Sequence, residues 1–193
     1  GNTSTNNQTN ILKTEITNNF GPAMIISNSN ANVDSCVFHS NRGAVEVSNS
    51  GSSLNNTVEL INNEFTYNTE QPAIQILGQE KLLIDNNLIK HNGTFMNSSL
   101  GGLYVQDVDS VYILNSRLDS NRSSYGGGAA FMRGNIKYIK VQNTRFQGNI
   151  SDEKAVASYQ YEGGSGMYIS TSIPADLLFN HCFFNGNYSN PNG

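Results

Sequence analysis

Seven times along the chain an apolar residue stands three positions before an asparagine, and successive asparagines are 22 to 38 residues apart. The seven pairs are Ile16/Asn19, Phe38/Asn41, Phe65/Asn68, Ile89/Asn92, Leu118/Asn121, Phe146/Asn149 and Phe184/Asn187. Self-similarity at such a period is typical of repeat architectures. We therefore treat each pair as the end of one structural unit and use its asparagine, the unit-final asparagine, as a reference position.

Other apolar residues keep a fixed place relative to the unit-final asparagine. Apolar residues stand ten and eight positions before it, for example Leu82 and Ile84. After it comes a small–apolar–x–apolar group, for example residues 102–105 (Gly-Leu-Tyr-Val). Apolar residues two apart predict a strand with one buried face. Each unit thus predicts three short strands, and no window of the chain shows the apolar face of a helix.

Stacking solves the problem that such short strands are unstable alone, because each unit buries the apolar interior of the next. Asparagine tolerates the left-handed backbone of a sharp corner, and its amide can bond to the same amide one rung away. We predict an all-β fold, a right-handed parallel β-helix (solenoid) of about seven coils with three short strands per coil. At roughly 4.8 Å per rung, the rod is about 30 Å long. An antiparallel sandwich would not explain the fixed asparagine positions.

The predicted domain boundaries follow from the polar ends of the chain. Residues 11–188 form the single β-helix domain, and residues 1–10 and 189–193 are polar N- and C-terminal tails or linkers. The chain starts with neither an initiator methionine nor a signal peptide, so we expect a mature or excised piece of a longer protein.

The composition argues against two kinds of partner, nucleic acid and the interior of a membrane. Thirty asparagines and 18 glycines stand against 26 charged residues, which is typical of a solenoid rich in corners. The net charge of −4 and the scattered 11 Lys and Arg argue against a nucleic-acid partner. No apolar run approaches the roughly 18 residues of a membrane span.

Cys36 and Cys182 occupy the same place in the second and seventh units. Five rungs separate them by about 24 Å, whereas a disulfide joins α-carbons at most about 7 Å apart. We therefore expect unpaired, inward-facing small residues. No second ligand stands at a suitable spacing, so we expect no metal and no cofactor.

Glycosylation is expected only in tails or loops, and only if the source is a eukaryotic secreted protein. Eight Asn-x-Ser/Thr sequons occur, but four of them contain unit-final asparagines whose amides should point inward. The better candidates for glycan attachment are Asn2, Asn7, Asn55 and Asn97.

The repeat resembles that of the chlamydial polymorphic outer membrane proteins, in which Phe-x-x-Asn alternates with a Gly-Gly-Ala-apolar element. Phe-x-x-Asn is literal at Phe38, Phe65, Phe146 and Phe184, and residues 127–130 (Gly-Gly-Ala-Ala) come near the glycine element. More broadly, it is similar to the β-helix repeats of autotransporter adhesins, protist surface proteins and pectin-degrading enzymes. The resemblance covers nearly the whole chain and implies packing rather than a particular chemistry.

The enzymes among these similar proteins imply a site rich in carboxylates that cleaves acidic polysaccharides. Asp107 and Asp109 alternate along one predicted strand, about 7 Å apart by the strand rise. Inverting glycosidases place their carboxyl groups roughly 6.5–9.5 Å apart. The plainer interpretation is a polar strand edge that leads into Val111. The three histidines have no partner at a diagnostic spacing, and we expect no catalytic residue.

One predicted surface is unusual. The x position of the small–apolar–x–apolar group should face outward, and in successive units it reads Ile25, Glu46, Gln75, Tyr104, Phe131 and Tyr168. Stacked exposed aromatic rings are suited to sugar rings or a partner protein. The candidate ligand-binding residues are therefore Tyr104, Phe131 and Tyr168. The open alternative is that the long loop of residues 150–165 covers this column.

Two functions remain open at this point. The favoured one is a non-enzymatic extracellular or cell-surface module, structural or adhesive, in a glycoprotein fibre, stalk, filament or adhesin. An uncapped end leaves backbone groups unpaired, so the partner would be further coils or a second copy stacked head to tail. Glycans are a further candidate partner. The alternative is a carbohydrate-binding or carbohydrate-active protein that uses the aspartate pair or the aromatic column. Ice binding is disfavoured because no flat Thr-x-Thr array exists.

Overall fold

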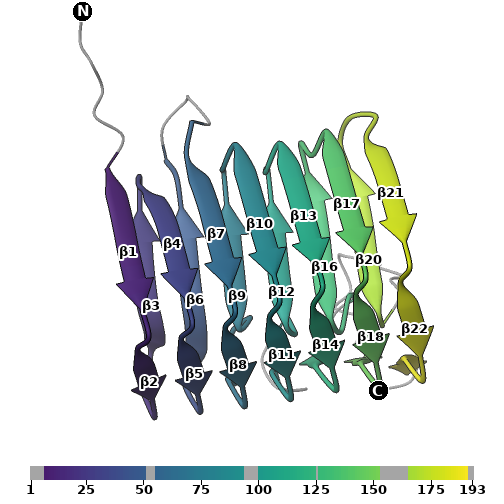
Figure 1. Ribbon diagram of the computed structural model, residues 1–193. Helices are drawn as coiled ribbons and strands as arrows, with labels where there is room; N and C mark the ends of the chain where they lie inside the picture. Colours follow the sequence, from purple (N-terminus) through teal and green to yellow (C-terminus); the bar gives the residue numbers. More distant parts are fainter. Residues whose placement is uncertain (1–6, 51–54, 94–99, 125, 153–164, 191–193) are drawn as a thin grey trace, which may run out of the picture.

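The computed structural model describes residues 7–50, 55–93, 100–124, 126–152 and 165–190. Strands follow one another through these residues without any helix. Every strand pair is parallel, and strands three or more apart in the sequence lie side by side, as Figure 1 shows from the purple to the yellow end. This arrangement confirms the predicted parallel β-helix.

Two seven-stranded sheets form adjacent walls of the solenoid. Sheet A contains, in spatial order, β1 (Gln8–Leu12), β4 (Asn30–Asp34), β7 (Thr57–Ile61), β10 (Lys81–Asp85), β13 (Ser110–Leu114), β17 (Tyr138–Gln142) and β21 (Asp176–Asn180). Sheet B contains β2 (Glu15–Thr17), β5 (Val37–His39), β8 (Glu64–Thr66), β11 (Leu88–Lys90), β14 (Arg117–Asp119), β18 (Arg145–Gln147) and β22 (Phe183–Asn185).

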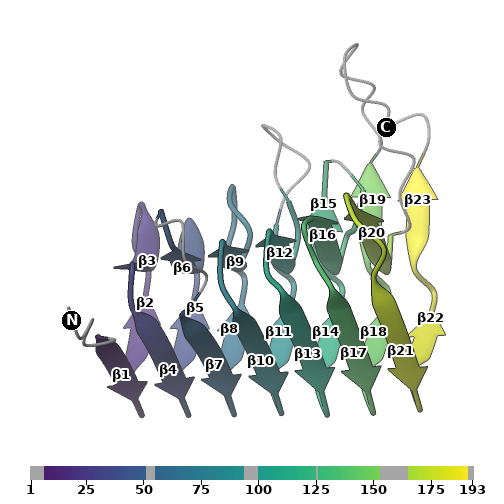
Figure 2. The same cartoon turned by 90° about the horizontal axis from the view of Figure 1, so that it is seen from above.

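The third wall, sheet C, has six strands: β3 (Pro22–Ser27), β6 (Gly43–Ser48), β9 (Ile74–Leu77), β12 (Leu103–Gln106), β16 (Ala130–Gly134) and β20 (Met167–Thr171). Figure 2 shows the three walls from above. The strand pairing places the predicted positions on top of one another; Leu82, for example, pairs with Val58 on one side and Val111 on the other.

The structure also contains a fourth, short sheet that the sequence did not predict. Sheet D contains β15 (Arg122–Ser123), β19 (Ile150–Asp152) and β23 (Tyr188–Asn190), which follow the unit-final asparagines of the last three units. Strands of two or three residues are too short to display the alternation of period two by which strands are recognised. The last coils therefore contain a further strand beyond the predicted three.

The strands extend slightly beyond the predicted range of residues 11–188, because β1 begins at Gln8 and β23 ends at Asn190. Residues 1–6 and 191–193 of the predicted tails lie outside the described residues.

The left-handed backbone recurs at the corners of the coils, and two of these corners keep a fixed distance from the unit-final asparagine. One is the residue six positions before the unit-final asparagine, with φ of 57° at Asn62, 54° at Asn86 and 49° at Asn115. The other is the residue immediately before the unit-final asparagine, such as Tyr67 with φ 56° and Ser120 with φ 56°. The corner therefore falls one residue earlier than the unit-final position. The unit-final asparagine is left with an inward-pointing side chain.

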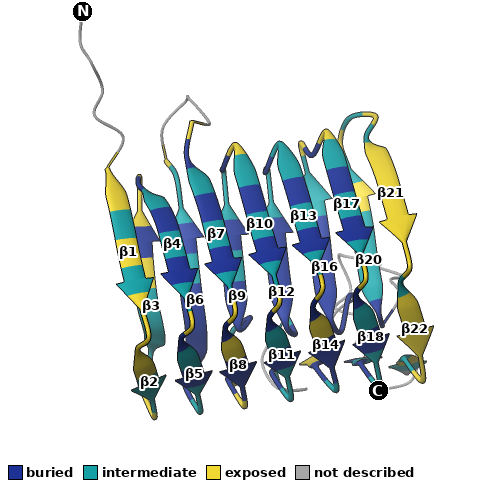
Figure 3. Cartoon of the chain, viewed as in Figure 1, coloured by how far each residue is buried: buried dark blue, intermediate teal, exposed yellow. Residues whose placement is uncertain are grey.

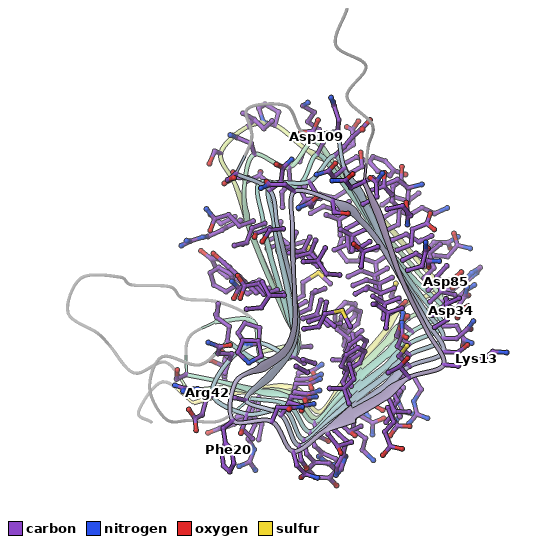
Figure 4. The ribbon with its side chains drawn as sticks, turned by 90° about the vertical axis from the view of Figure 1, so that its left-hand side faces the viewer. Lys13, Phe20, Asp34, Arg42, Asp85 and Asp109 are labelled. Carbon is purple, nitrogen blue, oxygen red and sulfur yellow. The ribbon has the colours of Figure 1, made fainter. Side chains whose placement is uncertain are left out.

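The core is a set of columns along the axis of the stack. Phe38 and Phe65 stack with ring centroids 5.0 Å apart and an interplanar angle of 5°, and Phe146 and Phe184 with 4.6 Å and 3°. In the middle coils the residues that face inward are buried. Figure 3 shows dark blue, buried residues along the strands of these coils, whereas β21 at the C-terminal end is yellow and exposed. Figure 4 looks along the stack, with side chains filling the interior and projecting from the outer faces.

Candidate functional site

The unit-final asparagines form a ladder inside the solenoid. The side-chain Nδ2 of each donates to the Oδ1 of the next, over 2.8 Å from Asn19 to Asn41, 3.1 Å to Asn68, 2.9 Å to Asn92, 3.0 Å to Asn121, 3.1 Å to Asn149 and 2.8 Å to Asn187. The predicted amide ladder is thereby confirmed.

Each amide of the ladder also binds the backbone. Asn121 Oδ1 accepts a second bond from the Asn92 N–H at 3.1 Å, and Asn121 Nδ2 donates to the Ile89 carbonyl at 2.9 Å. Asn121 is fully buried. Such a buried polar network stabilises a fold when all its members are paired. The ladder is therefore structural, and its amides are not available to a ligand.

Burial separates the sequons into two groups. The unit-final Asn92, Asn121 and Asn149 are buried, whereas the candidates Asn7 and Asn55 are exposed. The candidates Asn2 and Asn97 lie outside the described residues.

Expression in a host that N-glycosylates secreted proteins is expected to attach a glycan at Asn55 and none at Asn121. A glycan cannot be accommodated on an amide whose oxygen and nitrogen are both bonded inside the stack. Mass spectrometry of tryptic peptides measures the occupancy, with Asn55→Gln as the control. A glycan on Asn121 in folded protein would contradict the ladder.

The two cysteines lie in a second inner column, five positions before the unit-final asparagine. Cys36 is buried and its Sγ lies 3.5 Å from the Ile11 carbonyl and 3.3 Å from the Asp34 carbonyl. Cys182 Sγ lies 3.3 Å from the Val141 carbonyl. Both thiols are free, as predicted. Asparagine, serine and threonine fill the same column in other coils, so the cysteines act there as small, weak donors.

Asp107 and Asp109 do not lie on a strand, contrary to the prediction. They fall in the corner between β12 and β13, where Asp107 has φ 54°. Asp107 Oδ1 accepts the N–H of Asn135 at 2.8 Å, and Asp109 forms an ion pair of 2.6 Å with Lys137. Each carboxylate thus binds a residue of the next coil.

An ionic cluster on the outside of sheet B was missed in the sequence. Arg145 binds Asp119 in a bidentate manner, with Nε 3.2 Å from Oδ1 and Nη2 2.8 Å from Oδ2. Arg117 Nη2 adds a third contact to Oδ2 at 2.9 Å. Asp119 is 3% exposed. The signal was present, because Arg117 and Arg145 share one position in the repeat and Asp119 follows Arg117 by two residues.

A second outer feature is a row of aromatic rings at the corner beside sheet B. Tyr67, which is 51% exposed, stacks on His91 with centroids 5.0 Å apart, and meets His39 edge-on at 5.4 Å. We call His39, Tyr67 and His91 the corner rings. Partial burial lowers the pKa of His91, and the nearby positive charges of Lys90 and Arg122 lower it further, against the opposing effect of Asp119.

Acidification is therefore expected to destabilise the fold through His91. A ring with a depressed folded-state pKa contributes stability that is present above its unfolded pKa of 6.5 and is lost as the pH falls through the folded-state value. Urea unfolding at a series of pH values below 6.5 should show a smaller loss for His91→Asn, which tolerates the corner's φ of 56°. An NMR titration midpoint of His91 above 6.5 would contradict the stated direction.

The aromatic column lies where the sequence placed it. Tyr104 pairs with Phe131, and Phe131 with Tyr168, whose rings stack with centroids 4.8 Å apart. Tyr104 and Phe131 are only 8% and 3% exposed. In this structure the two rings are covered rather than displayed, and their ligand binding remains a prediction. Residues 153–164 of the long loop lie outside the described residues.

The C-terminal end of the stack carries an open hollow. Its volume is about 580 Å³, and its apolar lining comes from Met167, Ile169, Phe179 and Phe184. Phe179 and Phe184 are 42% and 48% exposed, although their equivalents one coil earlier, Val141 and Phe146, are fully buried. The last coil thus leaves its interior face uncovered among the described residues.

Two other kinds of feature, a metal-binding cluster and a membrane-spanning helix, are absent from the part of the chain that the structure describes. No three His, Cys, Asp or Glu residues gather there in a way that could hold a metal ion. No helix there is long and apolar enough to cross a membrane.

Comparison with known proteins agrees with this geometry. No characterised protein sequence and no solved structure matches the chain significantly. The model of one protein family, described as the right handed beta helix region, matches residues 2–191. Since this match spans nearly the entire chain and the structure is a stack of parallel coils, the chain belongs to the right-handed β-helix family.

Proposed function

We propose that the chain is a non-enzymatic structural or adhesive module of an extracellular or cell-surface protein, joined at its ends to further coils or to another copy. The observation that supports this proposal is the C-terminal end, whose apolar side chains no described residue covers. There Leu177, Phe179 and Phe184 pair with the buried Ile139, Val141 and Phe146 of the preceding coil. They are nevertheless 51%, 42% and 48% exposed. An exposed apolar face of this kind needs a neighbour in solution.

The carboxylates support a structural role over a catalytic one. Asp107, Asp109 and Asp119 each bind a backbone N–H or a basic side chain of the same or the adjacent coil. Hydrolysis of a glycosidic bond needs two carboxyl groups free to exchange protons or attack. Groups held in these contacts serve the packing of coils instead.

Incubation with pectin, alginate and chitin oligomers tests this proposal. We expect no product by chromatography, and no change in melting temperature with these ligands. Immunogold labelling of the producing cells should place the protein at the surface. Release of oligosaccharide product would contradict the proposal.

Carbohydrate binding is the second candidate, and the corner rings favour it. Tyr67 is half-exposed between His39 and His91, and an exposed ring supported by neighbouring rings suits a sugar face. In a glycan-binding assay, Tyr67→Ala should then abolish a signal that Tyr112→Ala, on the outside of sheet A, leaves intact.

A further inference from the structure

The outer face of sheet A has a central column of residues that runs from a negative to a positive charge. Four successive strands, β7, β10, β13 and β17, place side by side the residues Glu59, Leu83, Tyr112 and Lys140. Buried residues flank each of them along its strand, so their side chains face outward. Figure 4 shows Asp85, two residues beyond Leu83 on the same face of β10, pointing away from the interior. We call these four residues the sheet A column.

The two charged ends of the sheet A column have no ion-pair partner among the described residues. The ion pairs there join Arg42 to Glu70, Lys137 to Asp109, and two arginines to Asp119. Glu59 and Lys140 take part in none of them, and both are only partly buried. Each can therefore pair with a charge on another molecule.

The centre of the sheet A column is apolar and held in place by its neighbours. The ring of Tyr112 lies beside that of Tyr138, with centroids 5.5 Å apart, and Lys81 Nζ lies 5.5 Å from the Tyr112 centroid. Leu83 lies next to Tyr112 in the adjacent strand. Contacts of this kind limit the motion of the Tyr112 ring before binding, so that less side-chain entropy is lost on association.

A second copy of the chain fits this column when it is turned by 180° about an axis parallel to the strands. With the axis between β10 and β13, the rotation reverses the order of the strands and leaves each column opposite itself. Glu59 then faces Lys140 of the second copy, and Lys140 faces its Glu59. Leu83 faces Tyr112 in the same way. The column is thus complementary to itself.

The flanking columns of sheet A accept this arrangement and disfavour the alternatives. Lys81 would face Ser110, and Asp85 would face Leu114, so like charges do not meet. An axis on β10 itself would place Lys81 against Lys81 and Asp85 against Asp85 of the second copy. An axis along the stack would place Glu59 against Glu59. Because like charges in contact disfavour association, the axis between β10 and β13 is the one that fits.

We propose that the outer face of sheet A binds the same face of a second copy in a two-fold symmetric dimer, with the two stacks running in opposite directions. This side-by-side contact goes beyond the proposed function, which concerns the ends of the stack. It uses four middle coils, so it does not depend on what precedes the first coil or follows the last.

The size of the face predicts a weak dimer. Four rungs at about 4.8 Å and strands of five residues at about 3.3 Å per residue outline a flat face of roughly 300 Å². A stable complex buries about 800 Å² on each partner. The dimer is therefore expected to dissociate on dilution.

Sedimentation velocity of charge-reversal variants tests the proposal. The unchanged chain should show a monomer–dimer equilibrium that depends on concentration. Glu59→Lys and Lys140→Glu should each weaken dimerisation at least about tenfold, because the symmetry makes each substitution create two like-charge contacts. An equimolar mixture of the two variants should dimerise again, since every charge at these positions would then face an opposite one.

Glu64→Lys is the matched control. Glu64 is exposed on the outside of sheet B, and its substitution changes the net charge as much as Glu59→Lys does. It should leave dimerisation unchanged. Circular dichroism and thermal melts confirm that the variants fold.

Three results would each overturn the proposal. One is a chain that stays monomeric at every concentration. Another is association that Glu59→Lys leaves intact, which would assign the contact to the ends of the stack or to another wall. The third is a mixture of the two variants that stays monomeric. Failure of the proposed function would appear separately, as release of product from polysaccharides.

Discussion

Asn121→Ala is expected to lower the free energy of unfolding by about 3–5 kcal/mol, since each buried polar group left without a partner costs about 1–3 kcal/mol. The substitution removes the acceptor of the Asn92 N–H, one of the two acceptors of Asn92 Nδ2, and the side-chain donor to the Ile89 carbonyl. It also removes the Nδ2 donor to Asn149 Oδ1, which keeps its bond from the backbone N–H of residue 121. Equilibrium unfolding in urea measures the loss.

The matched control is Asn115→Gly. Asn115 stands at a left-handed corner of the same coil, with φ 49°, and its side chain lies on the outside, where Nδ2 bonds to Asp85 at 2.8 Å. Glycine adopts this backbone without strain, so the change should cost about 1 kcal/mol or less. Equal losses for the two variants would show that the position inside the stack is irrelevant.

Phe65→Ala should cost a similar amount, about 3–5 kcal/mol, because it removes a large side chain and leaves a cavity. Phe65 is fully buried and stacks face to face on Phe38 with centroids 5.0 Å apart. In the next coil Ile89 pairs with it. The cavity would therefore open between two coils and loosen both.

Phe65→Leu is the control for this column. Ile89 and Leu118 already occupy the equivalent place in the following coils. An aliphatic residue of nearly the right size should then cost less than about 1.5 kcal/mol. Thermal melts of the two variants compare their stabilities directly. An alanine variant as stable as the leucine variant would contradict the claim that this column packs the core.

The coil architecture was predictable because it depends on local periodicity. An apolar residue and an asparagine at fixed spacing specify an inward column and an inward amide, as Phe65 and Asn68 show. The strand pairing then follows from stacking one unit on the next. The absence of a disulfide between Cys36 and Cys182 was also predictable, because the number of coils between them places them too far apart.

The acidic residues were harder to place because their partners come from the next coil. Asp107 and Asp109 read as alternating strand positions, yet the chain turns there, and they bind Asn135 and Lys137 across the stack. Alternation over two residues cannot distinguish a strand from a corner. The buried Asp119 was not singled out in the sequence, although its partners could have indicated it. Arg117 and Arg145 both stand four positions before a unit-final asparagine.

The repeat pattern could not predict that Tyr104 and Phe131 of the aromatic column are buried. The repeat correctly placed Tyr104 and Phe131 on the outside of sheet C, but what covers an outer face depends on segments without periodicity.

The central claim is that asparagine amides stacked inside the solenoid hold its coils in register. Hydrogen exchange of side-chain amide groups, followed by NMR, tests it most directly. We expect slow exchange for the Nδ2 protons of the buried Asn68, Asn92 and Asn121, and fast exchange for the outer Asn86 and Asn115. Equally fast exchange at the inner and outer positions would contradict the account.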